Sequence, residues 1–170
     1  MKKIGLLLIL AIALVAGGLW FFSPEQQLKR KTNRIIKAFT IEGDESGIAS
    51  TTGALFLDSL FHDVVHVEAE AIDGLRQLLS LSPSKSIPLA HITSGRQSLP
   101  RYCSQFTHKL DAFSYEKIDN KNYHVSFDHS FTIVTKKPLK MTQTADIHTT
   151  FVFLKKDKAF KLSKVMFKKQ

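Results

Sequence analysis

The chain has 170 residues, of which 44% are hydrophobic and 23% charged, and its net charge at pH 7 is +9. This length suits a single domain, and the composition excludes disordered, collagen-like and low-complexity proteins. The single cysteine, Cys103, excludes an intrachain disulfide framework and a cysteine-cluster zinc or iron–sulfur site.

The N-terminus carries an uninterrupted apolar run. Residues 4–22 contain no polar or charged side chain and follow Lys2 and Lys3. A helix of this length reaches about 30 Å, which is the thickness of the hydrocarbon core of a bilayer. Trp20 and its two neighbouring phenylalanines occupy the position of an interfacial aromatic belt. We therefore predict that residues 1–22 form a signal anchor, a transmembrane helix. A signal peptide cleaved near residues 16–18 is the alternative.

The orientation of this span follows from its short N-terminus. Three residues ahead of an apolar run are typical of export signals whose N-terminus stays inside, although the basic residues that follow the run favour the reverse by their number. One cysteine and no Asn-x-Ser/Thr acceptor fit a bacterial envelope protein. The prediction is a single-pass protein of the bacterial inner membrane with its domain facing the periplasm, or a secreted protein after signal cleavage.

Basic residues gather at the two ends of the domain. Residues 23–40 hold five basic residues and one acidic residue, and residues 136–170 hold ten lysines and two aspartates. They do not interleave with aromatic residues in a recognisable nucleic-acid module, so we expect no nucleic-acid partner. Anionic lipid headgroups are the expected contact of the cluster next to the span, and a solvated helix face is the alternative. The cluster consists of Lys29, Arg30, Lys31 and Arg34.

Three helices are predicted in the first two thirds of the chain. Ser23 followed by Pro24 and Gln26 predicts an N-cap, and the amphipathic helix that it opens ends before Gly43. A second helix is predicted around Leu57–Phe61. A third is predicted over about residues 97–109, with Pro100 in its first turn.

Strand patterns occupy the remainder. Residues 64–70 alternate as a half-buried strand, whereas residues 71–94 read as a short helix and an irregular insertion. From Leu110 onward the period is two, with a turn at residues 119–122 and a bulge in the last strand. Helices followed by a meander of long strands predict an α+β fold with helices packed on a curved antiparallel sheet. The positions predicted to face inward are Val65, Val67, Phe113, Tyr115, Val125, Phe127, Phe131, Ile147, Phe151 and Phe153.

Four local patterns accompany this order of elements. They are Ser23-Pro-Glu-Gln-Gln-Leu, Leu60-Phe-His-Asp-Val-Val-His-Val, Ser94-Gly-Arg-Gln and Phe153-Leu-Lys-Lys-Asp-Lys-Ala-Phe-Lys-Leu. In these features residues 23–170 resemble the nuclear transport factor 2-like superfamily, whose cone-shaped fold is shared with ketosteroid isomerase-like and polyketide cyclase-like proteins. The longer stretch before Ser94 departs from the pattern. The fold serves enzymes, transport adaptors and secretion-system subunits, so it does not select a function.

Chemistry inside such a cone would need polar residues at inward positions. No carboxylate is predicted there, and the titratable exception is His129, between Phe127 and Phe131 on its strand. His129, Tyr115 and Phe131 are therefore the candidate ligand-binding residues, and no catalytic residue is assigned. The alternative is a core histidine satisfied by backbone groups.

Metal and nucleophile patterns are weak. His62 with His66, and Asp146 with His148, give two ligands each, which is short of the three or four that zinc takes. On the predicted third helix Cys103 and His108 fall on different faces, which indicates a buried, inert thiol. We expect no metal and no cofactor.

The sequence thus favours a membrane-tethered extracytoplasmic domain that acts as a non-enzymatic binding or assembly module, with a protein partner or a second copy of itself. The alternative is a small-molecule-binding protein or enzyme of the ketosteroid isomerase-like or polyketide cyclase-like kind. A polar pair deep in an open apolar cone would favour the alternative, and a cone filled by side chains would favour the module.

Overall fold

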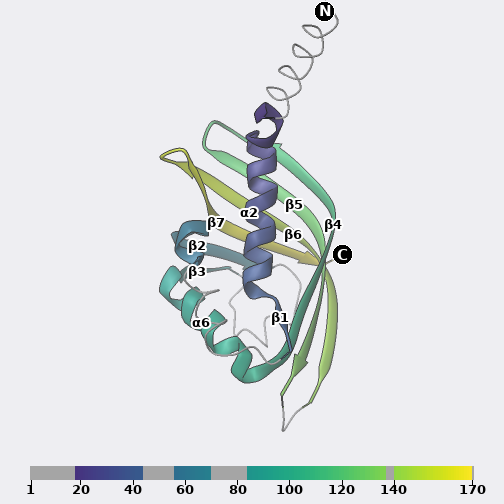
Figure 1. Ribbon diagram of the computed structural model, residues 1–170. Coiled ribbons are helices and arrows are strands. Elements are labelled where there is room, and N and C mark those ends of the chain that lie inside the picture. The colour runs from purple at the N-terminus through teal and green to yellow at the C-terminus, as the bar shows by residue number, and fades with distance from the viewer. Residues whose placement is uncertain (1–17, 44–55, 70–83, 137–139, 170) are drawn as a thin grey trace, which may run out of the picture.

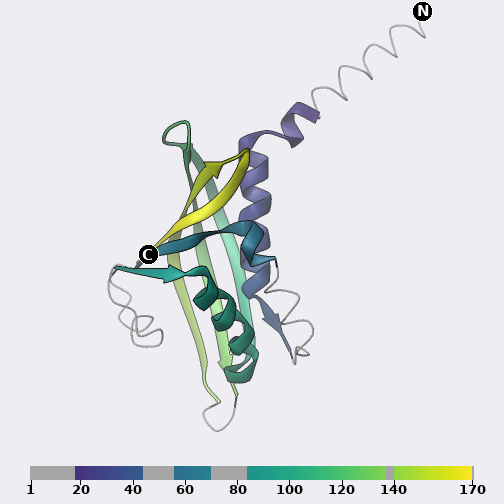
Figure 2. The same ribbon diagram turned by 90° about the vertical axis from the view of Figure 1, so that its left-hand side faces the viewer.

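A curved sheet of seven strands forms the body of the molecule, and helices lie across its concave side (Figures 1 and 2). The computed structural model describes residues 18–43, 56–69, 84–136 and 140–169. The strand order is β1-β4-β5-β6-β7-β2-β3. The elements are α2 (Pro24–Phe39), β1 (Ile41–Glu42), α4 (Leu57–Leu60), β2 (Phe61–Ala69), β3 (Ser84–Pro88), α6 (Leu89–Tyr102), β4 (Cys103–Lys117), β5 (Asn122–Thr135), β6 (Thr142–Lys156) and β7 (Ala159–Lys169).

The predicted membrane span falls almost wholly outside the described ranges, which begin at Gly18. Within those ranges no helix is both long enough and apolar enough to cross a membrane.

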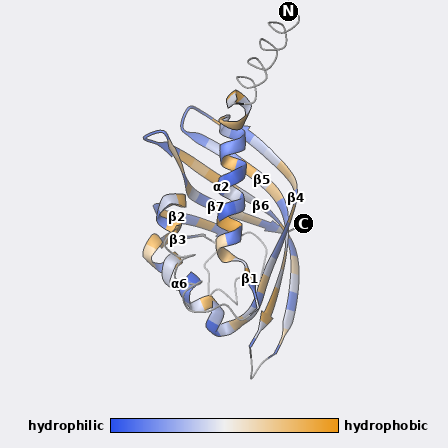
Figure 3. Ribbon diagram, viewed as in Figure 1, coloured by the Kyte–Doolittle hydropathy of each residue, from blue (hydrophilic) through white to orange (hydrophobic). Residues whose placement is uncertain are grey.

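Helix α2 begins where the capping pattern predicts. The Ser23 hydroxyl accepts a hydrogen bond from the Gln26 amide, and Pro24 takes the first helical position, where no amide donor is needed. Leu28, Thr32 and Ile35 recur at helical spacing and are buried against the sheet. The two colours that alternate along α2 in Figure 3 show its polar outer face and its apolar inner face.

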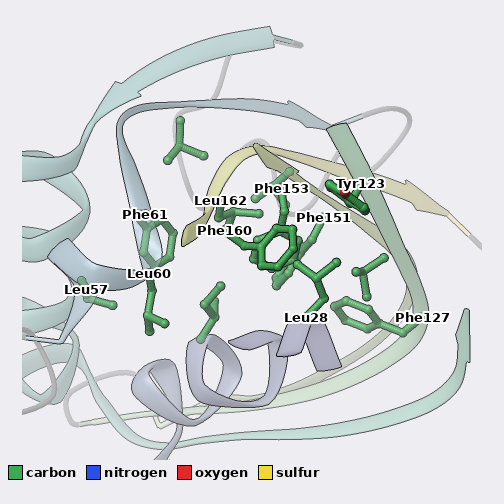
Figure 4. Close-up of a cluster of buried hydrophobic side chains, with 14 residues drawn as sticks. Leu28, Leu57, Leu60, Phe61, Tyr123, Phe127, Phe151, Phe153, Phe160 and Leu162 are labelled. Atoms are coloured by element: carbon green, nitrogen blue, oxygen red, sulfur yellow. The ribbon is translucent and has the colours of Figure 1, made fainter. Parts of the chain in front are cut away.

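The core lies between α2 and strands β5, β6 and β7. Alternate residues of β5 are buried from Tyr123 to Phe131, as the period of two predicts. Of these, Phe127 is completely buried and meets Phe151 of β6 edge to face, with ring centroids 5.1 Å apart. Figure 4 shows these rings packed around Leu28 of α2. Eight of the ten positions predicted to face inward belong to, or pack against, this core cluster.

Turns and irregularities also follow the sequence. The Asp119 carboxylate accepts hydrogen bonds from the amides of Lys121 and Asn122, which closes the β4–β5 turn. The predicted bulge in β7 is confirmed, because the pairing with β6 shifts between Val152 and Phe153.

The third helix is wrongly placed by the sequence prediction. It spans Leu89–Tyr102, so Pro100 lies in its last turn, and residues 103–109 belong to strand β4. The alternation of Phe106, His108 and Leu110 already marked this strand, and twelve residues of β5 pair with it. Likewise Ser84–Pro88, read as part of an irregular insertion, pairs antiparallel with β2. The short helix predicted around residues 75–79 lies outside the described residues.

The sheet is mixed, whereas the sequence predicted a wholly antiparallel sheet. Strand β2 begins at Phe61, three residues earlier than expected, and runs parallel to β7. A parallel neighbour is possible because a long connection separates the two strands in sequence. The second helix is accordingly only one turn long, Leu57–Leu60.

Candidate functional site

Two histidines meet on the inner face of the sheet. His108 lies on β4 and His129 on β5, where their direct cross-strand partners are Phe131 and Leu110 respectively, so the two imidazoles are diagonal neighbours. Nδ1 of His108 lies 2.7 Å from Nε2 of His129, and the rings stack with centroids 5.0 Å apart. One of these nitrogens donates a hydrogen to the other.

Aromatic rings surround this pair. The ring of Phe106 lies 4.3 Å from that of His108, and Phe127 and Phe131 flank His129 along β5 at 6.0 and 5.8 Å. His129 is only 7% exposed. The imidazoles therefore occupy an apolar site in which an unpaired hydrogen-bonding group lowers the stability of the fold.

Burial keeps both imidazoles neutral. Desolvation lowers the pKa of His108 to about 4, opposed by the backbone carbonyl of Phe39, and desolvation followed by repulsion from His108 lowers the pKa of His129 to about 4. Nδ1 of His108 contacts His129, and although Nε2 of His108 forms no hydrogen bond within the described residues, the nearby Phe39 carbonyl favours a hydrogen on it. Nε2 of His129 is then the donor to His108, and Nδ1 of His129 is a bare acceptor.

Several buried polar atoms have no hydrogen-bond partner in the described part of the chain. They include Nδ1 of His129 and Nε2 of His108, together with the hydroxyls of Thr149 on β6 and Thr32 on α2. Both threonines are fully buried, and Thr149 is the diagonal neighbour of His129 because His129 pairs with Ile147. Unpaired buried polar groups each cost about 1–3 kcal/mol of stability. Of these atoms, those of His108, His129 and Thr149 lie on neighbouring strands of the sheet, where they could bind a polar group.

A buried arginine fixes the helix end next to this pair. Arg96 of α6 is 3% exposed, and its Nε donates a hydrogen bond to the carbonyl of Ala38 in the last turn of α2. This bond satisfies one of the carbonyls that a helix C-terminus leaves without an intrahelical donor. It holds the end of α2, and with it the Phe39 carbonyl, beside His108.

The three predicted ligand-binding residues do not share one site. His129 and Phe131 lie together, but Tyr115 lies beyond the β4 bulge, where it stacks on Tyr123 with ring centroids 6.1 Å apart. Burial raises the pKa of Tyr115, with smaller contributions from Tyr123 and Glu25. The residue that sequence reasoning missed is His108, because residues 103–109 were read as helix. The signal for it was the alternation on β4.

The residues of the weak metal and nucleophile patterns have other surroundings in the structure. Nδ1 of His66 bonds to the Ser86 hydroxyl, and Nδ1 of His148 lies 2.9 Å from the Asp128 carboxylate on the outer face. No group of three or more metal-ligating side chains occurs among the described residues. Cys103 is buried on β4, and burial raises the pKa of its thiol.

The predicted lipid-contacting residues line α2. Lys29 and Arg34 are exposed, whereas Arg30 and Lys31 are half-buried. Arg30 stacks on the ring of Phe21 at 4.0 Å. Burial, and then repulsion by Arg34 and by Lys161 of β7, lower the pKa of Lys31.

The fold recurs in solved structures whose sequences differ strongly from this one. A nuclear transport factor 2-like superfamily protein from Salmonella enterica serovar Typhimurium matches with a TM-score of 0.60 and 16% identity, over 85% of this chain and 89% of its own. A type 3 hexachlorocyclohexane dehydrochlorinase from Novosphingobium barchaimii matches at 0.56 and 11%, over 84% and 83%. A proposed scytalone dehydratase from Novosphingobium aromaticivorans matches at 0.62 and 8%, over 85% and 83%. No protein-family profile and no curated protein matches the sequence.

These matches confirm the resemblance at the level of the fold: the described chain is an α+β domain with a nuclear transport factor 2-like cone. Identities of 16% and below carry no activity across, and the matching proteins include enzymes.

Proposed function

We propose that the chain is a membrane-tethered, extracytoplasmic small-molecule-binding protein, which is part of the alternative that the sequence left open, and that it recognises a small, largely apolar molecule through His129. It acts by binding and not by catalysis. The single observation that carries this proposal is the buried imidazole pair, in which Nδ1 of His129 has no hydrogen-bond partner among the described residues and is surrounded by aromatic rings. An arrangement that costs stability is retained where it serves recognition.

The chemistry of the pair favours binding over proton transfer. A general base works best with a pKa near the operating pH, and a pKa of about 4 makes each imidazole a weak base at neutral pH. A neutral imidazole is nevertheless a good hydrogen-bond acceptor. The ligand class is therefore a hydrophobic molecule that carries one hydroxyl or amide donor, with Thr149 as the next polar group on the neighbouring strand.

A matched pair of probes tests this recognition. Purified full-length protein in detergent is heated with aliphatic and aromatic alcohols and, separately, with the corresponding hydrocarbons. We expect a hydroxylated probe at a hundred times its Kd to stabilise the wild type by about 2.7 kcal/mol, which is several degrees in Tm. His129→Phe should remove the shift, whereas Asp146→Ala, on the outer face, should keep it. Equal shifts in wild type and His129→Phe would refute recognition by His129.

The membrane tether rests on the apolar run of residues 4–22 and on its direct continuation into the domain. The segment 18–23 is hydrogen-bonded to itself and to α2, and no long linker separates the two in the sequence. The domain would face the periplasm from the bacterial inner membrane. Carbonate washing should leave the protein in the membrane with its N-terminus intact. A soluble mature form that begins near residue 18 would contradict the tether and support the secreted alternative.

An enzyme of the ketosteroid isomerase-like or polyketide cyclase-like kind is the second candidate. One observation favours it: the 2.7 Å contact between Nε2 of His129 and Nδ1 of His108. When Nδ1 of His129 takes up a proton, the shared hydrogen has a route along this contact to His108, which becomes the imidazolium. Turnover of a bound probe by the wild type, absent in His129→Phe, would promote this candidate over the binding module.

A further inference from the structure

One end of the cone gathers three segments that are far apart in the sequence. The β4–β5 turn, the β6–β7 turn and the start of α2 lie at the same end in both views (Figures 1 and 2). The amide of Lys155 donates to the carbonyl of Lys121 over 2.7 Å, which joins the two turns. This region, residues 18–23, 116–122 and 155–158, is called the hairpin end.

Exposed apolar side chains mark the hairpin end. The run Leu19–Phe22 is exposed throughout, and the Ile118 side chain at the tip of the β4–β5 turn is 48% exposed. Isolated exposed aliphatic residues are ordinary, but an exposed aromatic run that continues directly from fourteen apolar residues is not. Aromatic side chains in such a position are typical of the interface between bilayer and water.

Lysines surround these apolar residues. All of the lysines on the two turns are exposed, and they outnumber the carboxylates there, Glu116, Asp119 and Asp157. The lysines are Lys117, Lys121, Lys155, Lys156 and Lys158. Lysines within a Debye length of a negatively charged membrane are attracted to it.

The start of the domain is held in a fixed direction. Nε2 of Gln27 donates to the Phe22 carbonyl over 2.6 Å, and the Arg30 guanidinium donates to the Phe21 carbonyl over 2.7 Å. The same guanidinium stacks on the Phe21 ring. A tether that enters α2 through these bonds restricts how far the cone can turn away from the membrane.

We propose that the hairpin end of the cone is a membrane-docking surface for anionic lipid headgroups, with Ile118 at the lipid interface and the turn lysines on the headgroups around it. This inference rests on the proposed tether. It goes beyond the tether because the β-turns, and not only the first helix, contact the lipid. The lipid is favoured over a protein partner because the exposed aromatic run is contiguous with the apolar residues 4–17.

A spin label tests the contact directly. Full-length protein in nanodiscs of mixed anionic and zwitterionic lipid is labelled at Ile118→Cys, and the native Cys103 escapes labelling because it is buried. Met141→Cys is the matched control, since Met141 is 46% exposed and lies between the end of β5 and the start of β6, away from the β4–β5 turn. We expect the label at 118 to be accessible to lipid-dissolved oxygen and shielded from a water-soluble nickel complex, and the label at 141 to show the reverse.

Charge variants separate the docking surface from the tether. The triple variant Lys121→Gln/Lys156→Gln/Lys158→Gln should lower the docked-to-undocked ratio of the 118 label by more than about tenfold at low salt. The control Lys85→Gln/Arg101→Gln/Lys140→Gln should leave the ratio unchanged. Protein that fails to enter nanodiscs would refute the tether. Two results would overturn the docking surface alone. One is protein that enters the nanodiscs but has a water-accessible label at 118 in the anionic lipid. The other is an equal fall of the docked-to-undocked ratio in the hairpin-end triple variant and in the control triple variant.

Discussion

Phe127 and His129 are successive inward positions of the same strand, yet their surroundings differ. The Phe127 side chain, which carries no polar group itself, is completely buried and packs with Phe151 and Leu28, although its cross-strand partner Thr149 has an unpaired hydroxyl. His129 is almost as buried, and its partner is a second imidazole. Apolar side chains pack around Phe127, whereas Nδ1 of His129 has no hydrogen-bond partner within the ranges that the structure describes.

The difference indicates that two regions along β4 and β5 have different roles. The cluster around Phe127 supplies the burial that stabilises the fold. The site around His129 lowers stability, since its buried polar atoms are only partly paired. We infer that the first region is there for folding and the second for recognition. Four predictions test this division, from the largest expected effect to the smallest.

Truncation in the apolar region should cost most. Phe127→Ala and Phe151→Ala should each lower the free energy of unfolding by about 3–5 kcal/mol, the range for a buried aromatic ring. Asp146→Ala should cost less than about 0.5 kcal/mol, because Asp146 is exposed and its hydrogen bond from the Ser130 hydroxyl lies on the surface. Urea unfolding followed by far-UV circular dichroism measures all three. The reverse ranking would show that the inner and outer faces of the sheet are interchanged.

Acid should act on the histidine region and spare the phenylalanine region. The folded pKa of each histidine, about 4, lies below its ordinary value of 6.5, so the unfolded chain binds more protons between these values. The contribution of the pair is constant above about pH 6.5 and is lost as the pH falls toward 4. The expected loss is roughly 2 kcal/mol between pH 6 and pH 5 for the two residues. Identical pH profiles of the wild type and the double variant His108→Leu/His129→Phe would contradict neutral burial.

Removing the buried arginine should damage the histidine end. Arg96→Met keeps most of the volume but deletes the donor to the Ala38 carbonyl, and we expect a loss of about 1.5–3 kcal/mol. The end of α2 should also exchange its amide hydrogens faster than the start of α2, where Ser23 caps the helix. Uniform exchange along α2 would show that Arg96 does not hold this end.

Single and double replacements of the histidines should differ in sign or size. His129→Phe alone removes the hydrogen-bond partner of Nδ1 of His108 and should lower the free energy of unfolding by about 1–3 kcal/mol. The double variant His108→Leu/His129→Phe removes both partners and should be nearly neutral or stabilising. Additive losses in the double-mutant cycle would contradict a coupled pair.

Much of the fold could be predicted from the sequence, because local patterns determine it. The Ser23 cap, the Asp119 turn and the alternation on β5 each depend on neighbouring residues. The start of β4 could not be placed in the same way. A run with Tyr102, Cys103 and Phe106 fits a helical stripe as well as a strand, and only pairing with β5 decides between them.

Of the two histidines in the candidate site, only His129 could be predicted from the sequence. His129 stood out among phenylalanines on one strand, but its partner comes from another strand 21 residues earlier. Diagonal proximity depends on the register between β4 and β5, which shifts at the bulge before Ser114. Tyr115, predicted beside His129, lies elsewhere because its cross-strand partner is Val125, four residues along β5 from His129.

Nitrogen NMR of ¹⁵N-histidine-labelled, full-length protein at pH 7 tests the central claim most directly. The account predicts that Nδ1 of His129 resonates as an unprotonated acceptor and that its resonance moves when a hydroxylated apolar probe is added. The Asp128-paired His148, on the outer face, should stay unchanged. A protonated Nδ1 of His129, or a resonance that no hydroxylated probe shifts, would contradict recognition by this imidazole.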